Sequence, residues 1–205
     1  QYTASMILLC GTLIVFAQLN YMRRQSLGVR TDRILVVKFP GPTEGMKIKM
    51  EAMRKAIRKL PLVSKVTCSG SVPGEEVAMF LSNRRTHDAL KQNRLYEMLS
   101  CDPDYMDAYG LELVAGRGFS EDYGDDVNKL VINETAARTL GYTDYESVIG
   151  EEISVETIEE PMQVIGVVKD YHQQALNRNY TPIMLFHKDK IDWIPQRYIS
   201  IVMKP

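Results

Sequence analysis

Two acidic groups are the first residues whose types and spacing suggest chemistry. Asp102 and Asp104 flank a proline, and Asp122, Asp125 and Asp126 follow in a second, acidic loop. Carboxylates at this spacing bind calcium when the loop folds around the ion. Both groups lie among turn-forming residues, which favours solvent-exposed loops. We therefore predict that these side chains are solvated. Weak calcium binding is the more specific alternative.

Histidine and cysteine offer no recognisable catalytic or metal-binding pattern. His172 closely follows Asp170, a pair that could serve acid–base chemistry, but no nucleophile or second partner accompanies it. Cys10, Cys68 and Cys101 form no C-x-x-C pair, and the histidines form no H-E-x-x-H motif. We predict no metal and no cofactor in this chain. Cys68 and Cys101 are expected to be free, partly buried thiols, with a disulfide between them as the alternative.

Motifs of nucleotide-binding and hydrolytic enzymes are also missing from the sequence. The run Gly116-Arg117-Gly118 has Glu121 where a dinucleotide fingerprint needs its third glycine. The chain has neither a Walker A loop nor a G-x-S-x-G nucleophile elbow. Its net charge of −1 gives no electrostatic preference for nucleic acid. The chain is therefore predicted to be neither an enzyme nor a nucleic-acid-binding protein.

The first 22 residues differ from the rest because they carry no charge. A spanning helix needs about 20 mainly apolar residues, and the stretch from Met6 to Ala17 is nearly all apolar. We predict a transmembrane helix over 1–22, with a secretory signal peptide or a buried core helix as alternatives. Arg23 and Arg24 by themselves favour a cytoplasmic location for the C-terminal side of this helix, a signal that weakens when a long domain comes next.

A β-α-β unit is predicted after this segment. Residues 23–33 are polar and are expected to continue as a helical stalk, interrupted near Gly28. A buried strand over 34–39, a helix over 44–60 and a second strand over 63–68 come next. The helix has one apolar stripe on a basic surface, so we expect it to pack on a sheet, with attachment to anionic lipid as the alternative. The stripe consists of Met46, Met50, Met53, Ile57 and Leu60.

Short strands and short helices are predicted for the remainder of the chain. The expected strands are 76–81, 94–100, 111–114, 129–132, 153–155, 162–168, 181–186 and 198–203. Short helices are expected at 105–109 and after Asn133, and residues 170–180 are expected to be polar and partly helical. The strands at 153–155 and 162–168 are expected to form a hairpin. This mixed pattern indicates an α+β fold.

Four segments carry a recognisable sequence pattern. They are YGLELVAGRGFS at 109–120, LVINETAA at 130–137, IGEEI at 149–153 and VIGVVKDY at 164–171. In this order they resemble motifs of MacB-like periplasmic core domains from ABC transporter permeases of the MacB/FtsX type, although Glu151 replaces a usual basic residue. The resemblance covers nearly the whole chain. Its motif residues are Gly116, Arg117, Phe119, Ile132, Asn133, Glu134, Gly150, Ile165, Gly166, Val167 and Asp170.

The resemblance implies an α+β fold in two parts, preceded by the transmembrane helix at 1–22 and the stalk at 23–33. A porter-like β-α-β layer would comprise residues 34–101 and 181–205. A small α/β subdomain would be inserted at 102–180. The second part of the porter-like layer is expected to be incomplete at its C-terminal end.

The resemblance also implies a function. The chain would be the extracytoplasmic domain of an ABC transporter permease that couples cytoplasmic ATP hydrolysis to periplasmic work by mechanotransmission, such as efflux or lipoprotein or peptide handling. It implies a cytoplasmic ABC ATPase, a permease homo- or heterodimer, and a periplasmic adaptor or substrate as partners. The chain would lie in the bacterial inner membrane, with residues from about 30 onward in the periplasm. A membrane-anchored sensor or adhesion domain without an ATPase is the alternative.

The motif residues have structural explanations in this sequence. The glycines suit tight turns or close backbone contacts, and Asn133 suits a helix cap. Arg117 is expected to pair with a nearby carboxylate such as Glu134 or Asp170. The candidates for core positions are Phe119, Ile132, Ile165 and Val167.

Overall fold

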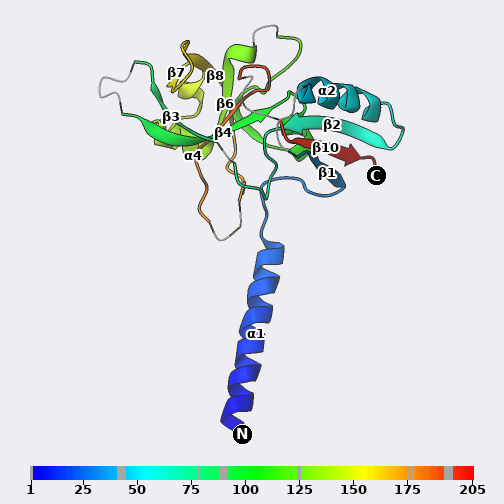
Figure 1. Cartoon of the computed structure of the whole chain (residues 1–205). Helices are drawn as coiled ribbons and strands as arrows, with labels where there is room; N and C mark the ends of the chain where they lie inside the picture. The colour runs from blue at the N-terminus through cyan, green and yellow to red at the C-terminus, as the bar shows by residue number, and fades with distance from the viewer. Residues whose placement is uncertain are drawn as a thin grey trace.

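A long N-terminal helix stands apart from a mixed body of strands and short helices (Figure 1). The computed structural model describes residues 2–40, 45–77, 79–87, 92–123, 126–174, 176, 178–191 and 196–205. Helix α1 (Tyr2–Arg24) contains a segment, Tyr2–Met22, that is long and apolar enough to cross a membrane, and none of it is buried in the body. The buried core helix considered from the sequence is therefore wrong. The apolar helix followed by mixed strands and helices agrees with the predicted α+β class.

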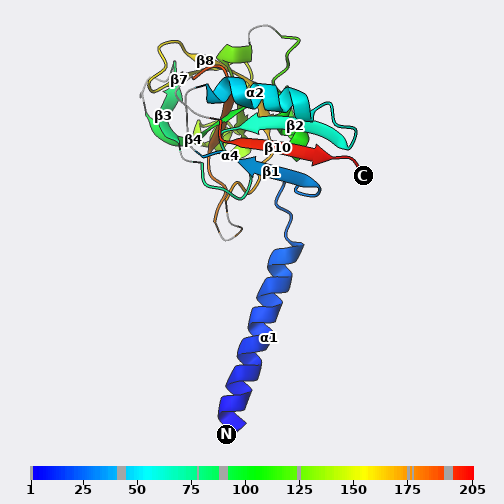
Figure 2. The same ribbon diagram turned by 45° about the vertical axis from the view of Figure 1, so that its right-hand side comes forward.

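One end of the sheet is a split β-α-β unit. Strands β1 (Ile34–Lys38) and β2 (Val63–Ser69) lie on either side of β10 (Tyr198–Met203), and each is antiparallel to it. Strands β1 and β2 are thus parallel to each other, as a β-α-β unit requires. Helix α2 (Met46–Ile57) lies over β2 and β10, and Figure 2 shows it on one face of these strands.

Helix α2 packs on the sheet as predicted, but with a face shifted from the predicted stripe. Met50 and Arg54 are its buried residues, whereas the exposed fraction is 42% for Met53 and 54% for Leu60. The helix ends at Ile57, so Leu60 lies beyond it. Arg54 forms an ion pair with the buried Asp102 carboxylate of the body. The side of α2 that carries Met46, Met50 and Arg54 therefore packs on the sheet, and Met53 lies on the exposed side.

Six further strands close into a ring. In spatial order they are β4 (Arg94–Cys101), β3 (Phe80–Arg85), β7 (Glu152–Val155), β8 (Met162–Val168), β6 (Lys129–Asn133) and β9 (Ile183–His187). Strand β9 then pairs with β4 again, which completes the ring. A pairing between β2 and β4 joins the ring to the split unit. The antiparallel pairing of β7 with β8 is the predicted hairpin.

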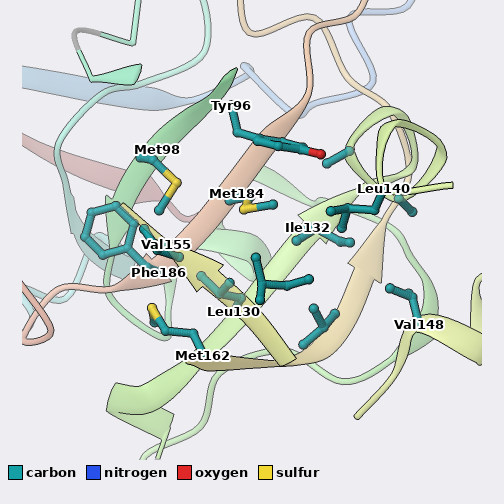
Figure 3. Close-up of a cluster of buried hydrophobic side chains, with 14 of the residues drawn as sticks. Tyr96, Met98, Leu130, Ile132, Leu140, Val148, Val155, Met162, Met184 and Phe186 are labelled. Atoms are coloured by element: carbon teal, nitrogen blue, oxygen red, sulfur yellow. The ribbon is translucent and has the colours of Figure 1, made fainter. Parts of the chain in front are cut away.

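The ring encloses a hydrophobic core. Successive side chains of a strand point to opposite faces, so alternate residues point inward, among them Met98 of β4, Ile132 of β6 and Phe186 of β9 (Figure 3). All three are almost fully buried. Helix α4 (Glu134–Thr139) adds Ala136 and Ala137 to the same core. The ring is therefore packed with side chains.

A second core lies on the outer side of the ring. It contains side chains of α3 (Tyr105–Tyr109), β4, β9 and β10, together with Tyr171. Strand β5 (Leu113–Gly116) pairs with β8 beside it. Two short 3₁₀ turns, η1 (Asp126–Asn128) and η2 (Glu146–Val148), complete the described elements. Val29 and Ile34, which follow α1 in the chain, pack against this second core.

Several elements differ in position from the sequence predictions. The strand predicted at 76–81 is β3, Phe80–Arg85, because pairing with β4 on one side and β7 on the other recruits its polar end. Val77 is buried in the second core without being part of a strand. Strand β5 begins two residues later than predicted. The described residues of 170–180 contain no helix, contrary to the prediction.

The predicted division at residues 102 and 180 stays a prediction. The ring takes β3 and β4 from the first predicted segment, β6 to β8 from the second and β9 from the third. Hydrogen-bonded pairing therefore continues across both predicted boundaries.

Candidate functional site

The link between α1 and the body is short. The helix ends at Arg24, and from Leu27 onward the chain is bonded to the body. Residues 27–33, which we call the strap, follow an irregular path with no helix. The predicted helical stalk over 23–33 is therefore wrong beyond Arg24. Backbone groups of the strap bond to the body, so they are not available for the i to i−4 bonds of a helix.

Backbone hydrogen bonds hold the strap at both ends and in its middle. The Leu27 carbonyl accepts from the His172 amide at 2.9 Å, and the Arg30 amide donates to the Tyr109 carbonyl at 2.7 Å. At the far end, the Arg33 carbonyl accepts from an amide of β10 at 2.9 Å. Three separate segments of the body thus hold the strap: the exit of β8, the end of α3, and β10.

Gly28 brings the strap into close contact with the body. Its φ of +74° favours glycine, and a Cβ there would lie 3.0 Å from Tyr171 Cβ and 3.1 Å from the Asp170 carbonyl oxygen. Tyr171 is buried in the second core, and Val29 packs against the same core. The strap is therefore seated directly on residues 170–172.

Asp170 connects this segment to helix α4. Its carboxylate accepts from the amide and the hydroxyl of Thr135, both at 2.8 Å, and from the Arg138 guanidinium at 2.5 Å. The Asp170 amide donates to the Glu134 carboxylate at 2.9 Å. The Asp170 side chain is only 7% exposed, whereas the Arg138 side chain is 47% exposed, so this charge-assisted bond lies at the surface of the body. The exit of β8 is thereby fixed to the first turn of α4.

Asn133 extends the same connection to β9. Its side-chain oxygen caps α4 by accepting from the Ala136 amide at 2.9 Å, and it also accepts from the Ile183 amide at 2.9 Å. Its side-chain nitrogen donates to the Thr181 carbonyl at 2.8 Å. The cap expected at this position is present. One buried amide thus ties together β6, α4 and the start of β9.

These contacts form a continuous bonded path from α1 to the ring, which we call the helix–body junction. It comprises the strap, residues 170–172 and residues 133–138. Within the described part of the chain, no cluster of three or more His, Cys, Asp or Glu is placed to hold a metal ion. Asp125, considered above for calcium, lies outside the described residues. The partners of the Asp170 carboxylate lie on α4. The helix–body junction thus connects the end of α1 to the ring through backbone and side-chain hydrogen bonds.

Comparison with known families decides the class of protein. A family model described as the MacB-like periplasmic core domain matches residues 4–205. The chain belongs to this family. It is thus the periplasmic core domain of a MacB/FtsX-like ABC transporter permease, and α1 fits a transmembrane anchor. The family is a non-catalytic permease component. The family implies a membrane context and an ATPase partner.

Solved structures share the fold of this MacB-like domain. The periplasmic region of MacB from Actinobacillus actinomycetemcomitans is 16% identical, with a TM-score of 0.56 over 86% of this chain and 77% of that one. The extracellular domain of the noncanonic ABC-type transporter YknZ from Gram-positive bacteria is 17% identical, with a TM-score of 0.56 over 83% and 82%. A domain of a protein assigned as a permease, from Porphyromonas gingivalis, is 21% identical, with a TM-score of 0.56 over 85% and 76%. No curated protein matches the chain.

One motif residue of the MacB-like domain has a different partner from the predicted ones. Arg117 forms two parallel bonds to Asp126, at 2.8 and 2.7 Å, and none of its described bonds goes to Glu134 or Asp170. The Asp126 carboxylate also accepts from the Ser120 amide at 2.8 Å. Burial acts to raise the pKa of Asp126, but the bonds from Arg117 and Ser120 outweigh it and lower the pKa. For Asp126, the predicted solvated loop is therefore wrong.

Arg117→Ala is expected to lower the free energy of unfolding by about 2–3 kcal/mol, because it leaves the buried Asp126 carboxylate without its counter-charge. Arg117→Lys should recover only part of this loss, since an ammonium cannot form the paired bonds. Urea unfolding monitored by circular dichroism measures both variants. Lys169→Ala, which removes an exposed ion pair with Glu112, is the control and should cost less than about 1 kcal/mol. An equal cost for Arg117→Ala and Lys169→Ala would contradict the prediction.

Other motif residues of the MacB-like domain serve close packing. Gly116 has a φ of +65°, and a Cβ there would lie 2.2 Å from the Ile165 carbonyl oxygen. Gly150 has a φ of +90° in the turn before β7. These positions need glycine for the conformation, the contact or both. The apolar motif residues are all buried, namely Phe119, Ile132, Ile165 and Val167.

A buried ion pair between α2 and the segment before α3 had no signal in the sequence pattern. Arg54 and Asp102 have side chains 7% and 0% exposed, with 3.5 Å between Nη1 and Oδ2. Asp102 also accepts from the Thr67 hydroxyl and, at 2.8 Å, from the Cys68 amide. The prediction that Asp102 is solvated is wrong. Its neighbours Cys68 and Cys101 are both free and buried.

Proposed function

We propose that this domain transmits movement of α1 into the periplasm, where the body acts on a substrate. The observation that carries the proposal is the strap, which fastens the body to α1 immediately after the helix ends. Gln25 and Ser26 alone separate the helix from the first backbone bond, between Leu27 and His172. So short a link limits how far the end of the helix can move away from the body.

The junction supports the proposal because it continues the rigid connection beyond the strap. Leu27 bonds to His172, and Asp170 bonds to the first turn of α4. Asn133 then reaches the start of β9. Backbone bonds and the charge-assisted bond to the nearly buried Asp170 carboxylate are expected to deform little under load. A displacement of the end of α1 would therefore move the body as a unit.

The energy source in this proposal is a cytoplasmic ABC ATPase that belongs to the same transporter. Its nucleotide-driven dimerisation would move the membrane helices of two permease copies, either identical or different. A periplasmic adaptor or substrate would meet the body. The family match favours this function over a membrane-anchored sensor or adhesion domain, because the family is one of transporter permeases.

A flexible insertion at the junction tests the proposal. Four residues, Gly-Ser-Gly-Ser, are placed between Ser26 and Leu27 of the intact permease, reconstituted with its ATPase in liposomes. A nitroxide label at Thr143→Cys, an exposed position, reports the distance between the two bodies by pulsed electron resonance. Within residues 1–205, a Cys10→Ser background leaves Cys68 and Cys101, which are buried and so poorly reactive. We expect a change in distance on trapping the ATP state in the wild type, and loss of at least half of that change in the insertion variant.

The matched control carries the same insertion between Glu159 and Glu160, an exposed turn distant from the strap in sequence. This control should keep the full nucleotide-dependent change. The proposal is wrong if the wild type shows no change, or if the insertion at Ser26 responds as fully as the control. ATPase activity is measured in all samples, so that a failure of assembly is recognised separately.

A further inference from the structure

A cavity of about 550 Å³ lies between the end of α1 and the loop that follows β8. Tyr21 and Met22 of α1 form one side, and His172, Arg178 and Tyr180 line the other. In Figures 1 and 2 the orange segment after β8 reaches down from the body to about the level at which α1 ends. Part of the lining is therefore supplied by the membrane helix itself.

Helix α1 sets the height of this cavity in the membrane. A span of 21 residues is about 32 Å long at 1.5 Å per residue, close to the roughly 30 Å of a bilayer's hydrocarbon core. Tyr21, at the end of the span, is 67% exposed, and tyrosine is typical of the boundary between acyl chains and headgroups. The cavity thus opens at the level of the lipid headgroups.

The polar lining of the cavity suits an anion. The Arg178 side chain is 60% exposed, and its ion pair with Glu76 is long, at 3.6 Å. Among the described residues that line the cavity, none is acidic. In the sequence, two further basic residues, Arg23 and Arg24, directly follow the span. An anionic headgroup in the cavity could bind the Arg178 guanidinium, and no carboxylate among the described lining residues would repel it.

We propose that this cavity binds the phosphate-bearing headgroup of an anionic phospholipid from the periplasmic leaflet. Arg178 would bind the phosphate, and Tyr21 and Tyr180 would flank the glycerol backbone. A membrane lipid fits better than a soluble phosphate ester, because one wall is the last turn of an apolar span and acyl chains would continue along it. The occupied cavity would join α1 to the loop after β8, beside the strap.

Spin-labelled lipids test the site in the full-length permease, reconstituted in nanodiscs. Electron resonance spectra give the immobilised fraction of labelled phosphatidylglycerol and, separately, of labelled phosphatidylcholine. We expect the wild type to prefer phosphatidylglycerol. Arg178→Gln should reduce this preference about fivefold, since one arginine near a membrane surface contributes about 1 kcal/mol to binding anionic lipid. Arg178→Lys should retain most of the preference.

The control is Arg58→Gln on α2, whose side chain is 58% exposed and has a similarly long contact, 3.8 Å, with Asp104. It should leave the lipid preference unchanged. The proposal is overturned if Arg178→Gln keeps the wild-type preference, or if Arg58→Gln loses as much. Displacement of the labelled lipid by millimolar glycerol 3-phosphate would point to a soluble ligand and also overturn it. The proposal depends on α1 lying in the membrane and not on force transmission, so a lipid preference without a nucleotide-dependent distance change would refute only the transmission.

Discussion

Gly166→Ala is expected to lower the free energy of unfolding by at least about 4 kcal/mol, which would leave little folded protein. A Cβ at this position would lie 2.1 Å from the carbonyl oxygen of Arg117 and 3.0 Å from its carbonyl carbon. These are backbone atoms, held in place because the Arg117 amide donates to the Ile165 carbonyl at 2.9 Å. Neither strand can move aside without losing the pairing of β5 with β8.

The matched control for this substitution is Gly141→Ala. Gly141 has a φ of +96°, but a Cβ there would meet nothing within 4 Å, so only the strain of the backbone conformation is added. That strain costs about 1–2 kcal/mol. Urea unfolding of the two variants, monitored by circular dichroism, compares them directly. Similar losses for Gly166→Ala and Gly141→Ala would show that the close contact with Arg117 does not limit this position.

Arg54→Met is expected to cost about 3–5 kcal/mol of stability, because it leaves a buried carboxylate without its counter-charge. Asp102 is fully buried, and the amide of Cys68 and the hydroxyl of Thr67 are its other partners. Adding Asp102→Asn to Arg54→Met should recover most of the loss, since the uncompensated charge is then gone. A double variant as unstable as Arg54→Met alone would mean that lost packing, and not charge, determines the cost.

The same pair predicts how stability depends on pH. Burial raises the pKa of Asp102 from 3.8 to about 6, against the lowering effects of Thr67, Cys68 and Arg54. Between these two values the folded state binds more protons than the unfolded state, so the contribution of Asp102 to stability falls as pH rises. The total change is about 3 kcal/mol, complete above pH 6. Urea unfolding between pH 4 and 7 measures it, and Asp102→Asn should flatten this part of the profile.

Elements with a strong local pattern could be predicted from the sequence. Strand β10 is the apolar run 198–203, and helix α3 spans Tyr105–Tyr109 with Gly110 as its C-cap, both as expected. Strand β3 could not be placed in this way, because Asn83, Arg84 and Arg85 become a strand only through pairing with β4 and β7. The strap shows no regular spacing of apolar residues, and its path is set by backbone hydrogen bonds to segments that are distant in the sequence.

The sequence motifs contain several residues of the helix–body junction, but they do not predict how these residues are arranged in space. Asn133, Glu134 and Asp170 were recognised through their motifs. Their meeting depends on β6 and β8 being parallel neighbours, which no local pattern reveals. Arg117 was expected to pair with one of these carboxylates, yet its partner is Asp126, nine residues away along the chain. Arg54 was missed because a basic residue on a basic helix gives no sign that it turns inward.

The closed arrangement of β3, β4, β6, β7, β8 and β9 has a mechanical consequence. Each of these strands has a hydrogen-bonded neighbour on both sides, so no single strand can be unzipped from an open border. A force applied to β8 would therefore be distributed over all six strands of the ring. Strands β1 and β5 each have one described pairing, with β10 and β8 respectively, so these two strands would yield before those of the ring.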